Sequence, residues 1–247
     1  VHIKNTFANP RILICVPTGS TPVERKAIQD SALAAGARRV QLIEEPIAAA
    51  IGAGLPISEA TGSMIVDIGG GTTEIAVMSL GGVVFSKSLR IAGDAMDGAI
   101  INYMRKKFNL LIGESTAEKI KKEIGTAIPT TNNVFLMKGR DIRTGTPKEI
   151  SLTEEDACEA LMPILNQMLA AIKEALESTP PELSADLVDM GLVLTGGGAL
   201  LKNIDKLISK DTGLPVTIAD NPLECVAIGT GKALENEELF STMLSEY

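Results

Sequence analysis

The sequence predicts an α/β protein, because apolar runs typical of buried strands alternate with helix signals along most of the chain. The chain has 247 residues, which is enough for one large domain or for two smaller ones, and either arrangement can bury a substantial core. Its composition, with 45% hydrophobic and 22% charged residues, is that of a folded globular protein and not of a disordered one.

The first strand and the first helix carry clear local signals. Arg11–Val16 is rich in apolar β-branched residues, which predicts a buried and parallel strand. A helix is expected from Pro22 to Gly36, since proline suits the first helical position. Thr21 can cap this helix, and Glu24 stands at the spacing of a capping box.

A second strand, an alanine-rich helix and a hairpin are expected next. Glu45-Pro46 opens the helix, which should end near residues 52–54, where glycines are placed to stop it. The pair Gly81-Gly82 predicts a turn between two strands. The strands of this region are expected at Arg39–Ile43, Met64–Asp67, Thr73–Leu80 and Val83–Ser88.

The second half of the chain continues the alternation. Ser115 and Glu118 stand at capping-box spacing, and Gly125 can stop the helix that they begin. Pro163 should kink a long helix, and Pro180-Pro181 marks the next break. The alternation of apolar and polar residues within 134–152 predicts a small β element. Helices are expected at Asp94–Phe108, Ser115–Ile124, Glu154–Glu177, Ala199–Ser209 and Pro222–Glu235, and strands at Leu192–Leu194 and Pro215–Ala219.

The composition argues against several classes of function. A formal net charge of −8 and the absence of Trp argue against nucleic-acid binding. No apolar run approaches the roughly 20 residues that span a bilayer. The single histidine, His2, argues against a His-rich metal site and against a Ser-His-Asp triad. Three distant cysteines are expected to fill the core in a reducing compartment: Cys15, Cys158 and Cys225.

The segment Asp67–Glu74, with the sequence DIGGGTTE, is the sharpest motif. Its glycines let backbone N–H groups crowd around an anion, and Thr72 and Thr73 add hydroxyl donors. Asp67 at the end of a strand can hold Mg²⁺ directly or through water. The alternative is an ordinary glycine-rich hairpin turn.

A second glycine cluster follows the predicted strand Leu192–Leu194. Gly196–Gly198 should lead directly into a helix, whose N-terminus attracts phosphate. The spacing fits neither a Rossmann nor a Walker A motif. A tight strand-to-helix turn is the alternative, but two glycine clusters in one α/β chain favour a nucleotide held between two lobes.

Two further segments are candidates. Glu44 and Glu45 precede a helix of small residues, which allows close helix approach, and one of these carboxylates can orient an attacking water. The alternative is favourable charge at a helix start. Glu118 and Lys121 lie on a charged helix and reach a ribose or base, unless that face is simply solvated. Surface positions are expected for the remaining acids Asp94, Asp97, Asp186 and Asp189.

Together these motifs resemble the actin-like ATPase superfamily, which also contains the Hsp70 chaperones and the sugar kinases. Within it the chain is similar to MreB, the family of bacterial actin homologues that determine rod shape. The likeness extends over nearly all 247 residues. It is carried by Val16-Pro17, Glu45–Ala50, Asp67–Glu74, Leu194–Leu200 and Asn221–Ala227.

The resemblance implies a role for each candidate residue. Asp67 would organise Mg²⁺, and Glu45, assisted by Thr72, would orient the water that attacks ATP. Contacts to the phosphates are implied for Gly69, Gly70, Gly71 and Thr72. Contacts on the adenosine side are implied for Glu118, Lys121, Gly196, Gly197, Gly198, Ala199 and Leu200.

The resemblance also implies the actin-like, ribonuclease H-like fold, with two lobes around a nucleotide cleft. Residues 11–62 and 224–247 would form the first large subdomain, which is incomplete here. Residues 63–93 and 166–223 would form the second, and residues 94–165 its small outer subdomain.

The expected function is that of a filament-forming, ATP-binding bacterial actin that organises lateral cell-wall synthesis and maintains rod shape. ATP should favour the polymer, and slow hydrolysis should weaken it. The expected partners are further copies of itself, the cell-wall elongation machinery with its membrane proteins, and the inner membrane surface, which it would contact peripherally from the cytoplasm; nucleic acid is not expected. The alternatives are a monomeric ATPase of the same superfamily, chaperone-like or kinase-like, and a scaffold that binds no nucleotide.

Two expectations concern the start of the chain. It begins at Val1 and not at Met, which is typical of a fragment or a processed chain. The family chain continues upstream with a first phosphate loop, so we expect these 247 residues alone to bind ATP weakly and to hydrolyse it negligibly. Ile3–Phe7 matches a loop that can dip into lipid in the family; an ordinary surface loop is the alternative.

Overall fold

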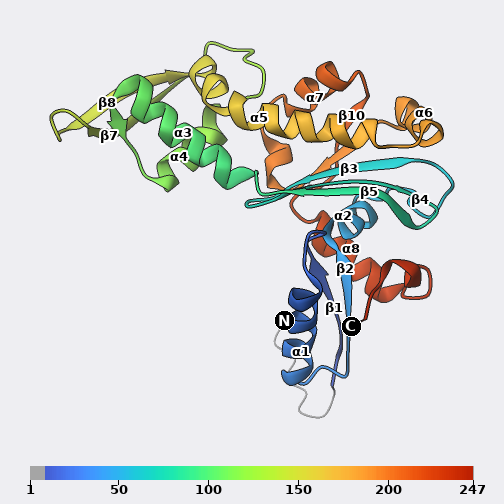
Figure 1. Ribbon diagram of the computed structural model, residues 1–247. Helices are drawn as coiled ribbons and strands as arrows, with labels where there is room; N and C mark the ends of the chain where they lie inside the picture. The colour runs from blue at the N-terminus through green and yellow to red at the C-terminus, as the bar shows by residue number, and fades with distance from the viewer. Residues whose placement is uncertain (1–8, 247) are drawn as a thin grey trace.

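A five-stranded sheet forms the centre of the molecule. The computed structural model describes residues 9–246 and confirms the α/β class. The parallel pairs β10–β9 and β9–β3 are followed by antiparallel pairing of β3 with β4 and of β4 with β5 (Figure 1). The bounds are Ser63–Ile68 for β3, Thr73–Ser79 for β4, Gly82–Leu89 for β5, Leu192–Thr195 for β9 and Val216–Ile218 for β10.

Helices pack on both faces of this sheet, and the alternation along β3 assigns its side chains to the two faces. Met64, Val66 and Ile68 join a core with the helices of one face. Ile65 joins a second core with the helices of the other face. The first face carries α5 (Glu154–Glu177) and α7 (Ile204–Thr212), and α3 (Gly93–Phe108) extends this core by packing against α5. The second face carries α2 (Glu45–Ala53) and α8 (Cys225–Glu235).

Two smaller sheets lie at different ends of the molecule (Figure 1). One is a parallel pair of β1 and β2 beside α1, whose N-terminal capping box between Thr21 and Glu24 is present as predicted. The other has the order β6-β7-β8 and packs beside α3 and α4. The bounds are Arg11–Val16 (β1), Pro22–Ala34 (α1), Arg39–Glu44 (β2), Leu110–Leu111 (β6), Glu114–Ile124 (α4), Val134–Asp141 (β7) and Pro147–Thr153 (β8).

Helices α2 and α8 cross in direct backbone contact between the central sheet and the β1–β2 pair (Figure 1). A Cβ atom on Gly52 would lie 1.9 Å from the carbonyl oxygen of Cys225, and one on Gly229 would lie 1.7 Å from that of Ala48. Only glycine fits at both positions. The expectation that small residues in this helix permit close approach is therefore confirmed.

Several predicted boundaries were wrong, for local reasons. The helix expected at Ser115 begins at Glu114, because Gly113 caps it and its carbonyl accepts the first helical hydrogen bonds. The turn expected at Gly81-Gly82 lies one residue earlier: Leu80 and Gly81 form the two-residue loop, and both have positive φ, as a type I′ turn requires. The helix expected directly after the glycine loop is interrupted at residues 201–203.

Asn203 has a φ of +59°, a left-handed conformation that asparagine tolerates, and α7 starts only at Ile204. Residues Gly197–Leu200 form a short 3₁₀ helix instead. The predicted start at Pro222 is likewise three residues early, since α8 begins at Cys225. Helix α6 (Pro181–Met190) and strand β6 were not predicted, whereas α5 continues through Pro163 as one element.

No helix within residues 9–246 is both long enough and apolar enough to cross a membrane. The segment Ile3–Phe7, for which a lipid contact was expected, lies outside the described residues.

The α2–α8 contact predicts opposite effects for two glycines of α8. Gly229→Ala should lower the free energy of unfolding by about 1–3 kcal/mol or more, because its Cβ meets backbone that cannot yield. Gly231→Ala should raise it by roughly 0.5–1 kcal/mol, because Gly231 is exposed, has open space around it and lies in the same helix. Urea denaturation measures both; equal effects of the two changes would contradict the backbone contact.

Candidate functional site

The two glycine loops lie side by side. Asp67 on β3 is the register partner of Thr195 on β9, and each loop directly follows its strand. Gly196 has a φ of +80°, and a Cβ there would lie 2.3 Å from the carbonyl oxygen of Ile68. A Cβ on Gly198 would lie 2.2 Å from the side chain of Ile68. Ligands of α/β sheets bind at such carboxyl ends of parallel strands.

The first loop, Gly69–Thr72, is a four-residue hairpin connection between β3 and β4. It is closed by a hydrogen bond from the amide of Gly69 to the carbonyl of Thr72 (2.9 Å). Gly70 and Gly71 are exposed, and within residues 9–246 the amides of Gly70, Gly71 and Thr72 donate no backbone hydrogen bond. The loop is thus a hairpin turn, and its amides can also donate hydrogen bonds to an anion.

The carbonyl groups of the same loop are bound by the N-terminus of α3. The amide of Gly93 donates to the carbonyl of Gly69 (3.1 Å), and the amide of Asp94 donates to that of Gly70 (2.8 Å). Helix α3 therefore fixes the hairpin through the carbonyl groups of the loop and leaves the amide donors of the loop open.

Asp67 is buried beneath the loops, with 7% of the residue exposed. Its Oδ1 accepts a hydrogen bond from the hydroxyl of Thr195 (2.8 Å), and its Oδ2 forms none within residues 9–246. Burial raises the pKa of Asp67, and the Thr195 hydroxyl opposes this rise. Thr195 was not predicted as a site residue; its signal was a hydroxyl at the end of a strand, immediately before the second glycine loop.

Glu45 and Glu74 bring two more carboxylates to the same side of the sheet. Glu74 is the antiparallel register partner of Asp67, only 1% of it is exposed, and it accepts a hydrogen bond from the hydroxyl of Ser88 (2.6 Å). Burial raises the pKa of Glu74. The pKa of Glu45 is raised by burial and then by the negative charges of Glu74 and Asp67. The three acids therefore repel one another, and Glu45 lies close enough to Asp67 and Glu74 to feel the charge of both.

Glu45 is also the first residue of α2, so its position suits the alternative role at a helix start equally well. Its neighbour Glu44 is instead paired with Arg25 (2.7 Å). Glu44 is thus held in an ion pair, and Glu45 is the carboxylate left near the glycine loops.

The acids fit a magnesium ion that keeps most of its water. Within residues 9–246 there is no group of three or more His, Cys, Asp or Glu spaced to hold a metal ion. Mg²⁺ in phosphate sites commonly uses one or two carboxylates together with water and phosphate oxygens. Asp67, with one oxygen held by Thr195 and the other free of protein hydrogen bonds, suits that kind of site.

The residues expected on the adenosine side have different surroundings. Lys121 on α4 donates to the carbonyl of Gly93 and to Asp97, both at 2.9 Å. Glu118 pairs with Lys122 (2.6 Å) on the solvent side of the helix, so the solvated-face alternative describes its contacts here. Asp97 was expected at the surface, but its side chain is only 15% exposed. Asp186 also differs from that expectation, because it accepts a hydrogen bond from the amide of Gly62 (2.7 Å).

The second loop is held from two sides. The amide of Gly196 donates to the carbonyl of Pro222 (2.9 Å), and a Cβ on Gly197 would lie 3.2 Å from Leu223. Ala199 is fully buried, whereas Leu200 and Leu223 are more than half exposed. The loop therefore presents apolar side chains beside its backbone.

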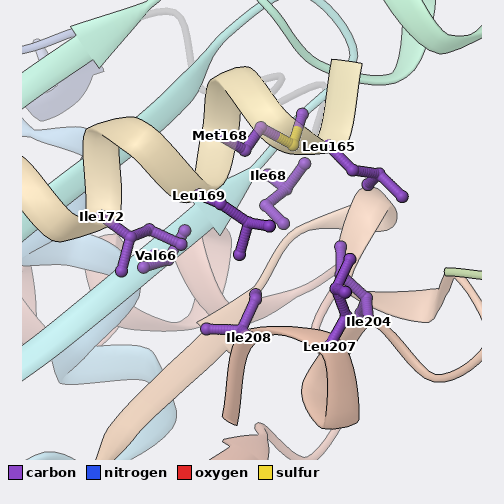
Figure 2. Close-up of a pocket in the computed structure, with 9 residues that line it drawn as sticks. All are labelled: Val66, Ile68, Leu165, Met168, Leu169, Ile172, Ile204, Leu207 and Ile208. Atoms are coloured by element: carbon purple, nitrogen blue, oxygen red, sulfur yellow. The ribbon is translucent and has the colours of Figure 1, made fainter. Parts of the chain in front are cut away.

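A small void lies behind the site and not in it. Figure 2 shows nine apolar side chains around it, which come from β3, α5 and α7. Its volume is about 10 Å³, close to the least that a water molecule needs. Val66 and Ile68 line it, so it lies on the face of β3 opposite Asp67 and forms part of the packing that supports this strand.

Comparisons with known proteins agree with this architecture. The model of the MreB/Mbl protein family matches residues 1–242. The chain is 58% identical over 238 residues to the cell shape-determining protein MreB of Escherichia coli. This match covers 95% of the chain and 68% of the Escherichia coli protein. It is 51% identical over 237 residues to the cell shape-determining protein Mbl of Bacillus cereus, with 96% and 71% covered.

A solved structure shares the whole arrangement. The crystal structure of MreB 5 of Spiroplasma citri bound to AMPPNP matches with a TM-score of 0.92 and 38% identity. The match covers 96% of this chain and 72% of that one. The actin-like fold that the resemblance implied is therefore confirmed.

Two buried glutamates should respond to pH in opposite ways. Burial raises the pKa of Glu74, so the folded state holds its proton more tightly and its contribution to the free energy of unfolding falls as pH rises. Glu154 accepts hydrogen bonds from Thr131, which lower its pKa, so its contribution grows with pH. As pH rises from about 3 to about 7, the free energy of unfolding of Glu74→Gln should increase relative to that of wild type. Over the same range the free energy of unfolding of Glu154→Gln should decrease relative to that of wild type. Urea denaturation across this range tests the pair, and trends of the same sign would refute the assignment.

Proposed function

The chain belongs to the MreB/Mbl family, and we propose that it is an ATP-binding bacterial actin that forms filaments and maintains rod shape by organising lateral cell-wall synthesis. One observation carries the proposal: two glycine loops meet at the carboxyl ends of β3 and β9, above a buried carboxylate. The names of its relatives, which are cell shape-determining proteins, support the cellular role. The AMPPNP bound to the Spiroplasma citri relative supports nucleotide as the ligand.

The open amides of Gly70, Gly71 and Thr72 would bind phosphate oxygens, because a triphosphate needs several converging donors. Gly69 would keep the loop closed through its bond to Thr72. The loop Gly196–Leu200, with its mixture of backbone and apolar side chain, would contact adenosine. Glu118 and Lys121 would complete the adenosine side.

Asp67 would hold Mg²⁺ through water, and the bound ion would neutralise charge on the phosphates. Thr195 keeps the Asp67 carboxylate in one orientation through its hydroxyl. Glu45, with help from Thr72, would orient the attacking water. A carboxylate whose pKa is raised by burial and by neighbouring acids is suited to accept a proton from that water.

The division into subdomains follows the same proposal. Residues 11–62 and 224–247, residues 63–93 and 166–223, and residues 94–165 would form the three parts named above. ATP would favour polymer, and hydrolysis would weaken it. The filament would lie on the inner face of the cell membrane and contact the cell-wall elongation machinery there.

Electron microscopy of the full-length protein tests the proposal directly. Filaments are expected with Mg-ATP and few or none without nucleotide. Titration calorimetry with Mg-ATP is expected to show saturable binding. A protein that neither binds ATP nor polymerises would overturn the proposed function.

The change Glu45→Ala should separate binding from hydrolysis. It removes the water-orienting carboxylate but none of the phosphate donors, so ATP affinity should stay nearly unchanged. The single-turnover rate of hydrolysis in the full-length protein should fall by about 10²-fold or more, the scale of a lost acid–base group. Glu59→Ala, in a loop remote from the glycine loops, is the control. An unchanged rate in Glu45→Ala would return this residue to a role at the helix start.

A further inference from the structure

Asp97, which has no role in the proposed function, forms a partly buried ion pair with Lys121. Its Oδ2 accepts from the ammonium of Lys121 at 2.9 Å, and the two side chains are 15% and 17% exposed. Its Oδ1 is buried and has no hydrogen-bond partner within residues 9–246. Burial raises the pKa of Asp97, while the Lys121 ammonium opposes this rise. A pair so placed is screened by salt much less than a surface pair.

The same ammonium also binds Gly93, the residue whose amide holds the hairpin loop. Lys121 also donates to the carbonyl of Gly93 at 2.9 Å, and the amide of Gly93 donates to the carbonyl of Gly69. A Cβ atom built on Gly93 would be 3.5 Å from the Lys121 Nζ and 3.6 Å from the Cα of Gly70. An unbroken path of hydrogen bonds therefore runs from Asp97 through Lys121 and Gly93 to the loop.

We propose that Asp97 is a positioning residue that holds the Lys121 ammonium against the N-terminus of α3 and thereby fixes the Gly69–Thr72 hairpin. Lys121 then serves as a clamp between α4, α3 and the loop. Without Asp97, the ammonium keeps a single carbonyl partner and is drawn to solvent. Without Lys121, Asp97 keeps a buried carboxylate with no counter-charge, so either loss releases the same contact.

The next residue of α4 provides a matched control. Lys122 pairs with Glu118, and these side chains are 68% and 50% exposed. They share the helix and the charge of the clamp but lie on its solvent side. Changing Lys122 therefore alters the charge of α4 without touching the contact with α3.

Hydrogen exchange of the nucleotide-free protein tests the clamp without any activity. The amides of Gly93 and Asp94, which donate to the loop, should exchange roughly tenfold faster in Asp97→Asn and in Lys121→Met, and the double variant should be no faster than either single one. Lys122→Met should match wild type. Unchanged exchange at both amides, or additive effects in the double variant, would overturn the proposal. If Asp97→Asn does not fold, Lys121→Met against Lys122→Met decides it.

Mg-ATP affinity provides a second measurement, which rests on the proposed function. Each single variant should bind Mg-ATP about tenfold more weakly than wild type, with no further loss in the double variant. Additive losses would mean that Asp97 acts independently of Lys121 and would refute the clamp. A wild-type protein that binds no ATP would contradict the proposed function, while the exchange measurement would still decide the clamp.

Discussion

The parallel pairing of β3 with β9 is the interaction on which the site depends. These strands are far apart in the chain, and their register places Asp67 beside Thr195. Both glycine loops begin where these strands end, so the pairing alone brings them together. The fit is tight enough that Gly196 and Gly198 admit no side chain against Ile68. A slip of one residue would turn Asp67 into the apolar core and would separate the loops.

The electrostatics of the site are arranged in two layers. Open amides of the hairpin form the upper layer, and the carboxylates of Glu45, Asp67 and Glu74 form the lower one. Each acid is destabilised in its charged form by burial, and Glu45 also by its two acidic neighbours. Such a cluster is costly for folding, and a divalent cation or a bound proton relieves it. The unfavourable negative charge of the three carboxylates thus lies where a positively charged ligand is expected to compensate it.

Local signals predicted most elements, because they depend on neighbouring residues. The capping box of α1 and the end of α4 at Gly125 are examples. The break before α7 was missed because it depends on distant partners: Asn203 is held in its left-handed turn by Thr126 and Ile128. The same limit applies to the site, for its glycine loops are visible in the sequence. The pairing of Asp67 with Thr195 and Glu74, and that of Asp97 with Lys121, emerge only from strand register and helix packing.

The crossing of α2 and α8 has a mechanical consequence. Where a layer of side chains separates two packed elements, rotamer changes can absorb a small displacement. Between Gly52 and Cys225, and between Gly229 and Ala48, no such layer exists. The two helices are therefore expected to move as one rigid unit. Glu45 is the first residue of α2, so a tilt of α8 should shift this carboxylate as well.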